Sequence, residues 1–334
     1  MVSRRKFIKK SALAATAIIT TPSLMSFAKY DIMKDKKEFE VIIIGGSYAG
    51  LSAAMALGRS LRKTLVIDSG KPCNRQTPQA HNFITHDGKE PSVISQIARK
   101  QVEEYPTVRF YSGLATNGRQ IEDGFEIITQ NSDSFKAKKI ILATGIKDIM
   151  PRIKGFSESW GISIIHCPYC HGYEYRNEKT GIFGNGDYGF EFSKMISNWT
   201  DDLTLFTNGK SELDDEQTKK LELNNIKIIE KEIASFENVD GHLKNIVFND
   251  GKKHPIKAVY SQVPFVQHSD ISNQLGCELD ENGYIKVDMF QKTNVEGLFA
   301  CGDNTTFMRS IANAVATGTV AGSMSNKELI DEYF

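Results

Sequence analysis

Short apolar runs that end at glycine or at an acidic residue recur along the chain. The first, residues 40–44 (Glu-Val-Ile-Ile-Ile), leads into a turn at 45–50 (Gly-Gly-Ser-Tyr-Ala-Gly) and then into good helix formers at 51–57. The next apolar run, 64–67, ends at Asp68. Continuous apolar runs of this kind are typical of parallel strands buried on both faces. The pattern therefore predicts an α/β fold built from strand, turn, helix and strand.

A second glycine turn repeats this order of elements later in the chain. The strand predicted at 181–183 runs into 184–189 (Gly-Asn-Gly-Asp-Tyr-Gly), and a helix and a further strand at 203–207 follow. Residues 244–263 are typical of a β-hairpin whose turn is Asn-Asp-Gly at 249–251. We therefore expect a second nucleotide-type domain.

Two other segments return to the first pattern. Residues 139–145 (Lys-Ile-Ile-Leu-Ala-Thr-Gly) form an apolar strand that ends in a small-residue turn, and 297–303 (Gly-Leu-Phe-Ala-Cys-Gly-Asp) precede a helix rich in small residues at 311–324. We expect both strands to join the first sheet, so that the second domain interrupts the first as an insertion. The predicted fold class is α/β, with two Rossmann-like, three-layer ββα nucleotide-binding domains at 38–152 plus 258–334 and at 153–257.

The N-terminal segment has the three-part arrangement of an export signal. It is basic through Lys10, apolar over 12–19, and has a small-residue cleavage site at 26–28 (Ser-Phe-Ala). Residues 3–9 (Ser-Arg-Arg-Lys-Phe-Ile-Lys) match the twin-arginine motif, and the apolar run is about half as long as a membrane span. We expect a twin-arginine signal peptide at 1–28 and a periplasmic protein without a stable membrane anchor. The alternative is a basic helix at the N-terminus of a cytoplasmic enzyme.

The charge balance argues against a nucleic-acid binder. The chain has 41 Lys and Arg against 41 Asp and Glu, whereas polyanion-binding proteins carry a basic excess. Five of the basic residues and none of the acidic ones lie in 1–28, which leaves 36 against 41, or about −5, for the rest of the chain. That net charge is ordinary for a soluble domain.

The first glycine turn has the parts of a dinucleotide site. Backbone N–H groups at the start of the helix would bind a pyrophosphate, and Asp68 would accept a ribose hydroxyl; Ser47 stands where the pattern has its second glycine. The second turn keeps all three glycines, Gly184, Gly186 and Gly189. Neither an acid nor an Arg cluster follows its second strand, so it is either a pyridine-nucleotide site without specificity residues or a turn used for packing.

The segment 166–174 (His-Cys-Pro-Tyr-Cys-His-Gly-Tyr-Glu) contains two thiols separated by two residues. Three interpretations compete on the sequence: a structural disulfide or buried thiols, a c-type haem attachment site, and a redox-active dithiol that communicates with a flavin. No second Cys-x-x-Cys pair completes a zinc site, so no metal is predicted. We favour the redox dithiol, with His171 as the acid–base candidate because it follows Cys170 directly.

Taken together, these motifs resemble the low-molecular-weight thioredoxin reductase family over about residues 38–330. Within it, 45–50, 167–174 and 205–209 are similar to the branch of gliotoxin- and holomycin-type dithiol oxidases and their bacterial relatives. The resemblance implies a homodimer with non-covalently bound FAD. It also implies a redox-active Cys167–Cys170 pair in which Cys170 faces the flavin and Cys167 exchanges with substrate, and it places His171 where reductases have an acid–base Asp.

The resemblance further assigns the flavin contacts and argues against NADPH. Reductases place an Arg-rich phosphate clamp where this chain has 207–210 (Thr-Asn-Gly-Lys), and the predicted compartment holds no NADPH pool. The twin-arginine route carries folded proteins, which fits a cofactor inserted before export. The expected flavin contacts are Gly45, Gly46, Ser47, Tyr48, Ala49, Gly50, Asp68, Asn74, Arg75, Ala143, Thr144, Gly145, Gly302, Asp303, Arg309, Ser310 and Ile311.

The expected function is an FAD-dependent thiol–disulfide oxidoreductase. A small dithiol or a thioredoxin-like protein would reduce the cysteine pair, Cys170 would reduce the flavin with help from His171, and oxygen or another acceptor would take the electrons. The alternative is an NAD(P)H-dependent thioredoxin-disulfide reductase that runs in the opposite direction, and a remoter one is a c-type haem protein. The sequence does not rank the remaining candidates, His81, His268, Cys73, Cys277 and Cys301, although packing is the expected role of the cysteines.

Overall fold

A seven-stranded sheet organises the first lobe of the computed structural model, which describes residues 37–334; the predicted signal peptide at 1–28 lies outside the described residues. The strand order is β3-β2-β1-β6-β5-β4, and β17 also pairs with β6. Pairing is parallel among β3, β2, β1, β6 and β17, and antiparallel in β4–β5–β6. The strands are β1 (Glu38–Ile44), β2 (Thr64–Asp68), β3 (Val108–Ser112), β4 (Ala115–Ile121), β5 (Gly124–Thr129), β6 (Ser134–Leu142) and β17 (Leu298–Ala300).

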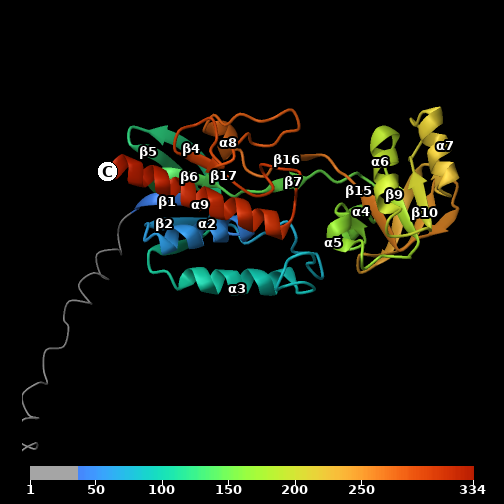
Figure 1. The fold of residues 1–334 in the computed structure, drawn as a ribbon, viewed down its shortest axis with the longest axis horizontal. Coiled ribbons are helices and arrows are strands. Elements are labelled where there is room, and N and C mark those ends of the chain that lie inside the picture. Colours follow the sequence, from blue (N-terminus) through green and yellow to red (C-terminus); the bar gives the residue numbers. More distant parts are fainter. Residues whose placement is uncertain (1–36) are drawn as a thin grey trace, which may run out of the picture. The chain divides into compact units, whose positions relative to one another are not determined.

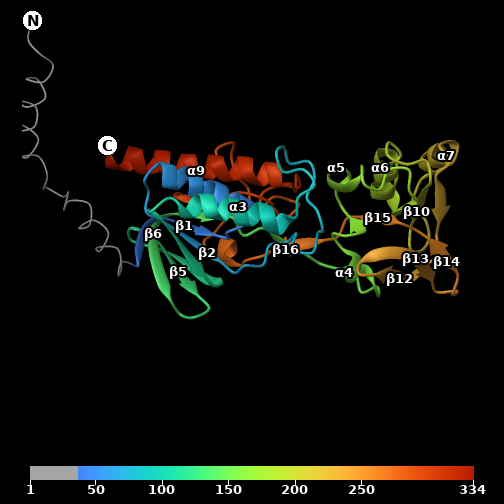
Figure 2. The ribbon, with the colours of Figure 1, turned by 90° about the horizontal axis from the view of Figure 1, so that it is seen from below.

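The central strand β1 is buried on both faces, as its apolar run predicts. Val41 and Ile43 pack in one hydrophobic cluster, and Ile42 and Ile44 pack in another. The first cluster lies under α2 (Tyr48–Arg59), α3 (Pro91–Glu103) and α9 (Ile311–Tyr333), which cover one face of the sheet in Figures 1 and 2; the second lies under the β4–β5 hairpin and α8 (Ile271–Gln274).

Helices α2 and α9 pack unusually closely, because small residues line the contact. A Cβ atom added to Gly318 would overlap with the backbone of Ala49, and one added to Gly322 would meet the backbone of Ala53. Ser52 Oγ donates a hydrogen bond across the contact to the carbonyl of Val315 (2.7 Å). The small-residue helix expected at 311–324 thus begins at Ile311 and is one half of this contact. Its packing holds the first glycine turn in place.

The second lobe has three layers. A parallel sheet of order β11-β10-β9-β15-β8 lies between helices on one side and a three-stranded antiparallel sheet, β12-β13-β14, on the other. Its strands are β8 (Ile164–Ile165), β9 (Thr180–Phe183), β10 (Leu203–Phe206), β11 (Lys227–Ile229), β12 (Ile233–Val239), β13 (His242–Phe248), β14 (Lys253–Pro255) and β15 (Ala258–Ser261). Its helices are α4 (Phe156–Ser159), α5 (Pro168–His171), α6 (Gly186–Ile196) and α7 (Asp215–Leu223).

The two sheets carry the arrangement that the sequence predicts, with one difference at a boundary. Strand β15, which we expected to begin the return to the first domain, pairs in parallel with β8 and β9 of the second sheet. The antiparallel pair β7 (Ile146–Asp148) and β16 (Phe265–Gln267) then connects the lobes. The second sheet therefore continues through Ser261 rather than stopping at 257. In the part of the chain described, no helix has the length and apolarity needed to cross a bilayer.

Candidate active site

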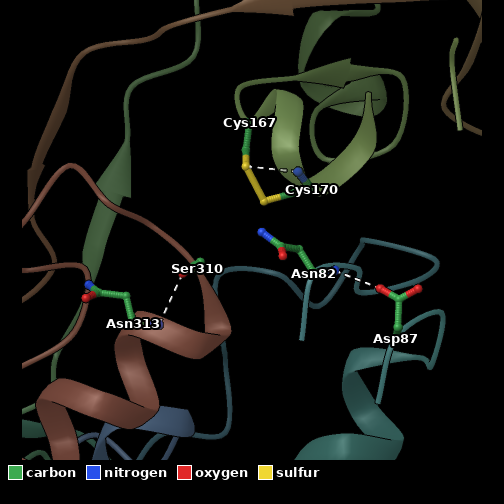
Figure 3. Close-up of a disulfide and its surroundings, with 6 residues drawn as sticks. All are labelled: Asn82, Asp87, Cys167, Cys170, Ser310 and Asn313. Atoms are coloured by element: carbon green, nitrogen blue, oxygen red, sulfur yellow. Dashed lines mark hydrogen bonds between the residues drawn. A yellow bond between two sulfur atoms is a disulfide. The ribbon is translucent and has the colours of Figure 1, made fainter. Parts of the chain in front are cut away.

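The two cysteines of the Cys-x-x-Cys segment are joined in a disulfide, with their Cα atoms 5.3 Å apart. Cys167 lies two residues after strand β8 and is the N-cap of α5. Its Sγ accepts a hydrogen bond from the backbone N–H of Cys170 (3.2 Å). Pro168 is the first residue of α5, a position at which a backbone N–H has no partner within the helix. Proline, which lacks this N–H, therefore loses no hydrogen bond there. The local sequence therefore closes a small disulfide-bearing loop (Figure 3). The predicted pairing is confirmed, and the redox role of the pair stays a prediction.

Two histidines flank the disulfide, and both are held neutral. Desolvation, and then the nearby His81, lower the pKa of His171 to about 4. Desolvation, followed by the positive charge of Arg309, lowers the pKa of His166 to about 3, and its ring stacks on Trp160 with centroids 5.8 Å apart. At neutral pH each imidazole is therefore uncharged and keeps a lone pair on one ring nitrogen.

We expect these histidines to make the fold sensitive to acid. Both pKa values are lower in the folded than in the unfolded chain, so stability is present above pH 6.5 and falls as the pH drops towards 4, by about 1.4 kcal/mol per pH unit for each histidine. The urea midpoint of the protein should therefore decrease between pH 7 and pH 5. His171→Gln should flatten this decrease, whereas the exposed control His242→Gln should leave it unchanged. An equally steep decrease in His171→Gln would contradict the assignment.

His81, which the sequence could not rank, lies between two carboxylates. Its Nδ1 is 3.6 Å from Asp87 and its Nε2 is 3.6 Å from Glu174. Glu174 follows the disulfide segment in the second lobe, whereas Asp87 belongs to the same loop as His81. His268 also lies close to a predicted flavin contact, because its backbone N–H donates to the carbonyl of Gly145 (3.3 Å). The structure thus brings both unranked histidines to the site region.

The first glycine turn has the backbone that a nucleotide site requires. Gly45 has φ +106°, and a Cβ there would overlap with the carbonyl of Ala143 at the end of β6. Asp68 closes the turn from β2, accepting a hydrogen bond from the N–H of Gly46 (3.2 Å). Ser47 is the N-cap of α2 and makes no capping hydrogen bond with its side chain. The first amides of α2 are therefore open to an anion such as a pyrophosphate.

Several residues that we expect to contact the flavin already use their side chains in contacts within the protein. Tyr48 is buried and donates from its hydroxyl to the carbonyl of Pro91 (2.9 Å), and Ser310 caps α9 by accepting from the N–H of Asn313 (3.1 Å). Ile311 packs against the core under α2 and α9. For these residues the backbone, rather than the side chain, is what the structure leaves available to a cofactor.

A charged chain of residues lies beside the Gly302 turn. Arg309 pairs with both oxygens of Asp148 in β7 (2.9 and 3.0 Å), and its Nε is 3.7 Å from Asp303. Burial raises the pKa of Asp303, while Arg309 counteracts that effect. Asp148 also accepts from the indole N–H of Trp160 (3.2 Å), so this chain of contacts reaches the residue that stacks on His166. No sequence motif singled out Asp148.

Three polar atoms near this turn are buried without a hydrogen-bond partner among the described residues: Arg309 Nε, Asn313 Nδ2 and Asn304 Oδ1. Buried polar groups are normally paired, so two donors and an acceptor left open next to a glycine turn indicate a ligand with polar edges. The residues present therefore fit a flavin dinucleotide: an anion site at α2, a carboxylate at Asp68, and open donors and an acceptor by α9. Asn304 and Asn313 lie close to the predicted residues, but no motif singled them out.

The second glycine turn is engaged by an acidic loop. Asn185 donates from its side chain to the carbonyl of Lys210 (2.9 Å) and accepts from the N–H of Glu212 (2.9 Å). Oε2 of Glu212 lies 3.6 Å from where a Cβ on Gly186 would be. Four acidic residues and one lysine occupy 210–216. A pyrophosphate at this turn would meet a carboxylate instead of the Arg cluster that selects NADPH.

The other cysteines are poor nucleophiles. Burial raises the pKa of Cys301 to about 12 and that of Cys277 to about 11, whereas Cys73 is exposed and its Sγ lies 3.8 Å from a carboxylate oxygen of Asp303, which raises its pKa by disfavouring the thiolate. Their thiols are therefore protonated at neutral pH. Within residues 37–334, no group of three or more His, Cys, Asp or Glu side chains is placed to hold a metal ion.

Comparison with known proteins gives consistent matches over the described region. The pyridine nucleotide-disulphide oxidoreductase model matches residues 39–318. Thioredoxin reductase tcpT of Claviceps purpurea is 32% identical, covering 87% of this chain and 94% of the relative. The structure of a putative thioredoxin reductase TrxB from Bacillus anthracis superposes with a TM-score of 0.85 at 31% identity, over 89% of this chain and all of that one. An oxidoreductase from Agrobacterium tumefaciens gives 0.83 at 34%, over 88% and 99%.

Proposed function

The chain belongs to the pyridine nucleotide-disulphide oxidoreductase family, and from this premise we propose that it is an FAD-dependent oxidase of dithiols that works through Cys167 and Cys170. The observation that carries the proposal is the contrast between two sites. The disulfide lies next to His171, a neutral imidazole with a free lone pair, whereas the described residues at the second glycine turn include Glu212 and no cluster of basic residues for NADPH.

Thiol–disulfide exchange would run on this chain's own residues. A substrate thiol gives its proton to His171 and attacks Cys167 Sγ; the disulfide breaks, and its electron pair leaves on Cys170 Sγ as a thiolate. The second substrate thiol then attacks the substrate sulfur of the mixed disulfide; the bond to Cys167 Sγ breaks, the second proton passes to that sulfur, and the oxidised substrate leaves. Two electrons have moved from substrate to protein, and one bond has formed for each that broke.

The cofactor that the family binds is FAD, and the first lobe would hold it. The amides at 45–50 and the carboxylate of Asp68 suit its dinucleotide part, and the Gly302 turn with the open atoms of Arg309, Asn304 and Asn313 suits its other polar edges. When bound, FAD supplies the two-electron acceptor that restores the disulfide and delivers the electrons to oxygen or another oxidant. Domain boundaries near 152 and 261 are part of the proposal.

Anaerobic reduction of the purified flavoprotein tests the direction of electron flow. Because the acidic loop opposes a pyrophosphate at Gly186, we expect small dithiols to bleach the flavin at least about 100-fold faster than an equal concentration of NADPH. Stopped-flow absorbance measures both rates, and readmitted oxygen should restore the oxidised spectrum. Fast bleaching by NADPH with slow bleaching by dithiols would instead establish a thioredoxin reductase, the activity named for several relatives.

Export and assembly complete the proposal. The twin-arginine motif in 1–28 supports translocation of the folded flavoprotein to the periplasm, and the thioredoxin reductase resemblance supports a homodimer. Fractionation of cells that express the chain with and without Arg4→Lys and Arg5→Lys tests the first point. The mass of the purified flavoprotein in solution tests the second.

A further inference from the structure

Asn82 faces the disulfide from the loop at 80–89. Figure 3 shows its carboxamide pointing toward Cys170, across the space that separates this loop from α5. Asn82 has φ +58°, a left-handed conformation that asparagine tolerates better than most residues. Within the part of the chain that the structure describes, no hydrogen bond engages its side chain, so the carboxamide is available to a group at the disulfide.

The loop is fixed in this position from both lobes. Ala80 and Lys89 close its base through a hydrogen bond of 2.8 Å, and Asp87 accepts from the backbone N–H of Asn82 (2.8 Å). His81 lies between Asp87 of the loop and Glu174, four residues beyond Cys170. The same residues that shape the loop therefore tie it to the disulfide segment, which sets where the Asn82 carboxamide lies.

The two sulfurs differ in their supply of hydrogen-bond donors. Cys167 Sγ already accepts the backbone N–H of Cys170, whereas α5 offers no corresponding donor to Cys170 Sγ. His166 is desolvated and neutral and contributes no positive charge, and His171 is charged only while it holds the substrate proton. A thiolate that forms on Cys170 therefore needs a donor from outside its own helix, and the side chain aimed at it is Asn82.

We propose that the Asn82 carboxamide donates a hydrogen bond to Cys170 Sγ when the disulfide opens, and so stabilises the sulfur that leaves with the electron pair. The inference rests on the proposed exchange at Cys167 and Cys170 and adds a catalytic residue to it. A neutral N–H donor suits this position, because it stabilises the thiolate without forming an ion pair that would persist after the disulfide closes again.

Several charged and titratable groups around Cys170 could also influence its reactivity. On its own helix and the adjoining segment these are His166, His171 and Glu174; the loop contributes His81 and Asp87; and the Arg309–Asp148 pair acts on His166. All of them are retained when Asn82 alone is replaced. A change in Cys170 reactivity on that replacement is therefore attributable to the carboxamide.

The experiment measures the alkylation rate of Cys170 by iodoacetamide against pH, in the flavoprotein carrying Cys167→Ser, with the modified peptide identified by mass spectrometry. Asn82→Gly keeps the backbone conformation and removes the donor, so we expect about tenfold slower alkylation at pH 7, equivalent to about one unit in the thiol pKa. Asn82→Asp replaces the donor with a carboxylate and should slow alkylation further. Asn225→Gly, at another left-handed asparagine (φ +58°), should not change the rate.

Alkylation rates that are the same in the Asn82→Gly, Asn82→Asp and Asn225→Gly variants would overturn the proposal. The measurement requires no electron donor, so it separates this inference from the proposed function. A shifted Cys170 profile supports the role of Asn82 even if NADPH proves to be the reductant. An unchanged profile excludes that role even if dithiol turnover is confirmed.

Discussion

Replacing Cys170 with serine is expected to lower dithiol turnover by at least about 10³-fold while leaving the flavin bound. The reason is chemical: the disulfide is the only described bond in the chain that a substrate thiol can exchange with, and a serine hydroxyl cannot form it. Cys167→Ser should have an effect of similar size, and the double variant should lose no more than either single one, because the two sulfurs act as a unit.

Oxygen uptake with a small dithiol measures this loss, and Cys277→Ser is the matched control. Cys277 is a partly buried thiol far in sequence from the disulfide, and serine is nearly isosteric, so turnover should stay within about twofold of the parent. Denatured, unreduced protein should show the three thiols of Cys73, Cys277 and Cys301 and no more. Full turnover in both active-site variants would mean that the protein binds thiols without exchanging with them.

Most of the strand framework followed from local pattern, because buried parallel strands need continuous apolar runs. Strand β1 covers the run predicted at 40–44, and β2 ends at the predicted Asp68. The assignment of β15 was wrong for a physical reason. A four-residue buried strand carries no local information about which sheet it joins, and its partners β8 and β9 lie far from it in sequence.

The site residues likewise fall into those that local sequence could predict and those that it could not. The disulfide could be predicted because both sulfurs and the adjacent histidine lie in one short segment whose spacing carries the chemistry. Asn82, Asp148 and Asn313 could not, since each acquires its place from contacts between segments far apart in sequence, as in the pairing of Asp148 with Arg309. His81 shows the intermediate case: its residue type suggested function, but only the fold shows the two carboxylates that hold it.

Gly45→Ala is expected to cost the protein its flavin and several kcal/mol of stability. The backbone at Gly45 has φ +106°, and an added Cβ would overlap with the carbonyl of Ala143. That carbonyl cannot move aside easily, because the N–H of Ala143 donates to the carbonyl of Ile44 (2.8 Å) where the buried C-terminal ends of the two central strands lie side by side. The turn would have to open, which would displace the first amides of α2 from the position that a pyrophosphate needs.

Gly70→Ala is the control that separates the cost of an unfavourable backbone conformation from the cost of a steric overlap of the added Cβ. Gly70 also has a positive φ (+71°), yet no atom lies within 4 Å of the position its Cβ would take. We expect it to cost about 1 kcal/mol through backbone strain alone and to retain a full complement of flavin. Gly45→Ala should instead purify with less than about a tenth of the flavin and melt more than about 10 °C lower. Full flavin content and a small change in Tm for Gly45→Ala would contradict the placement of the cofactor at this turn.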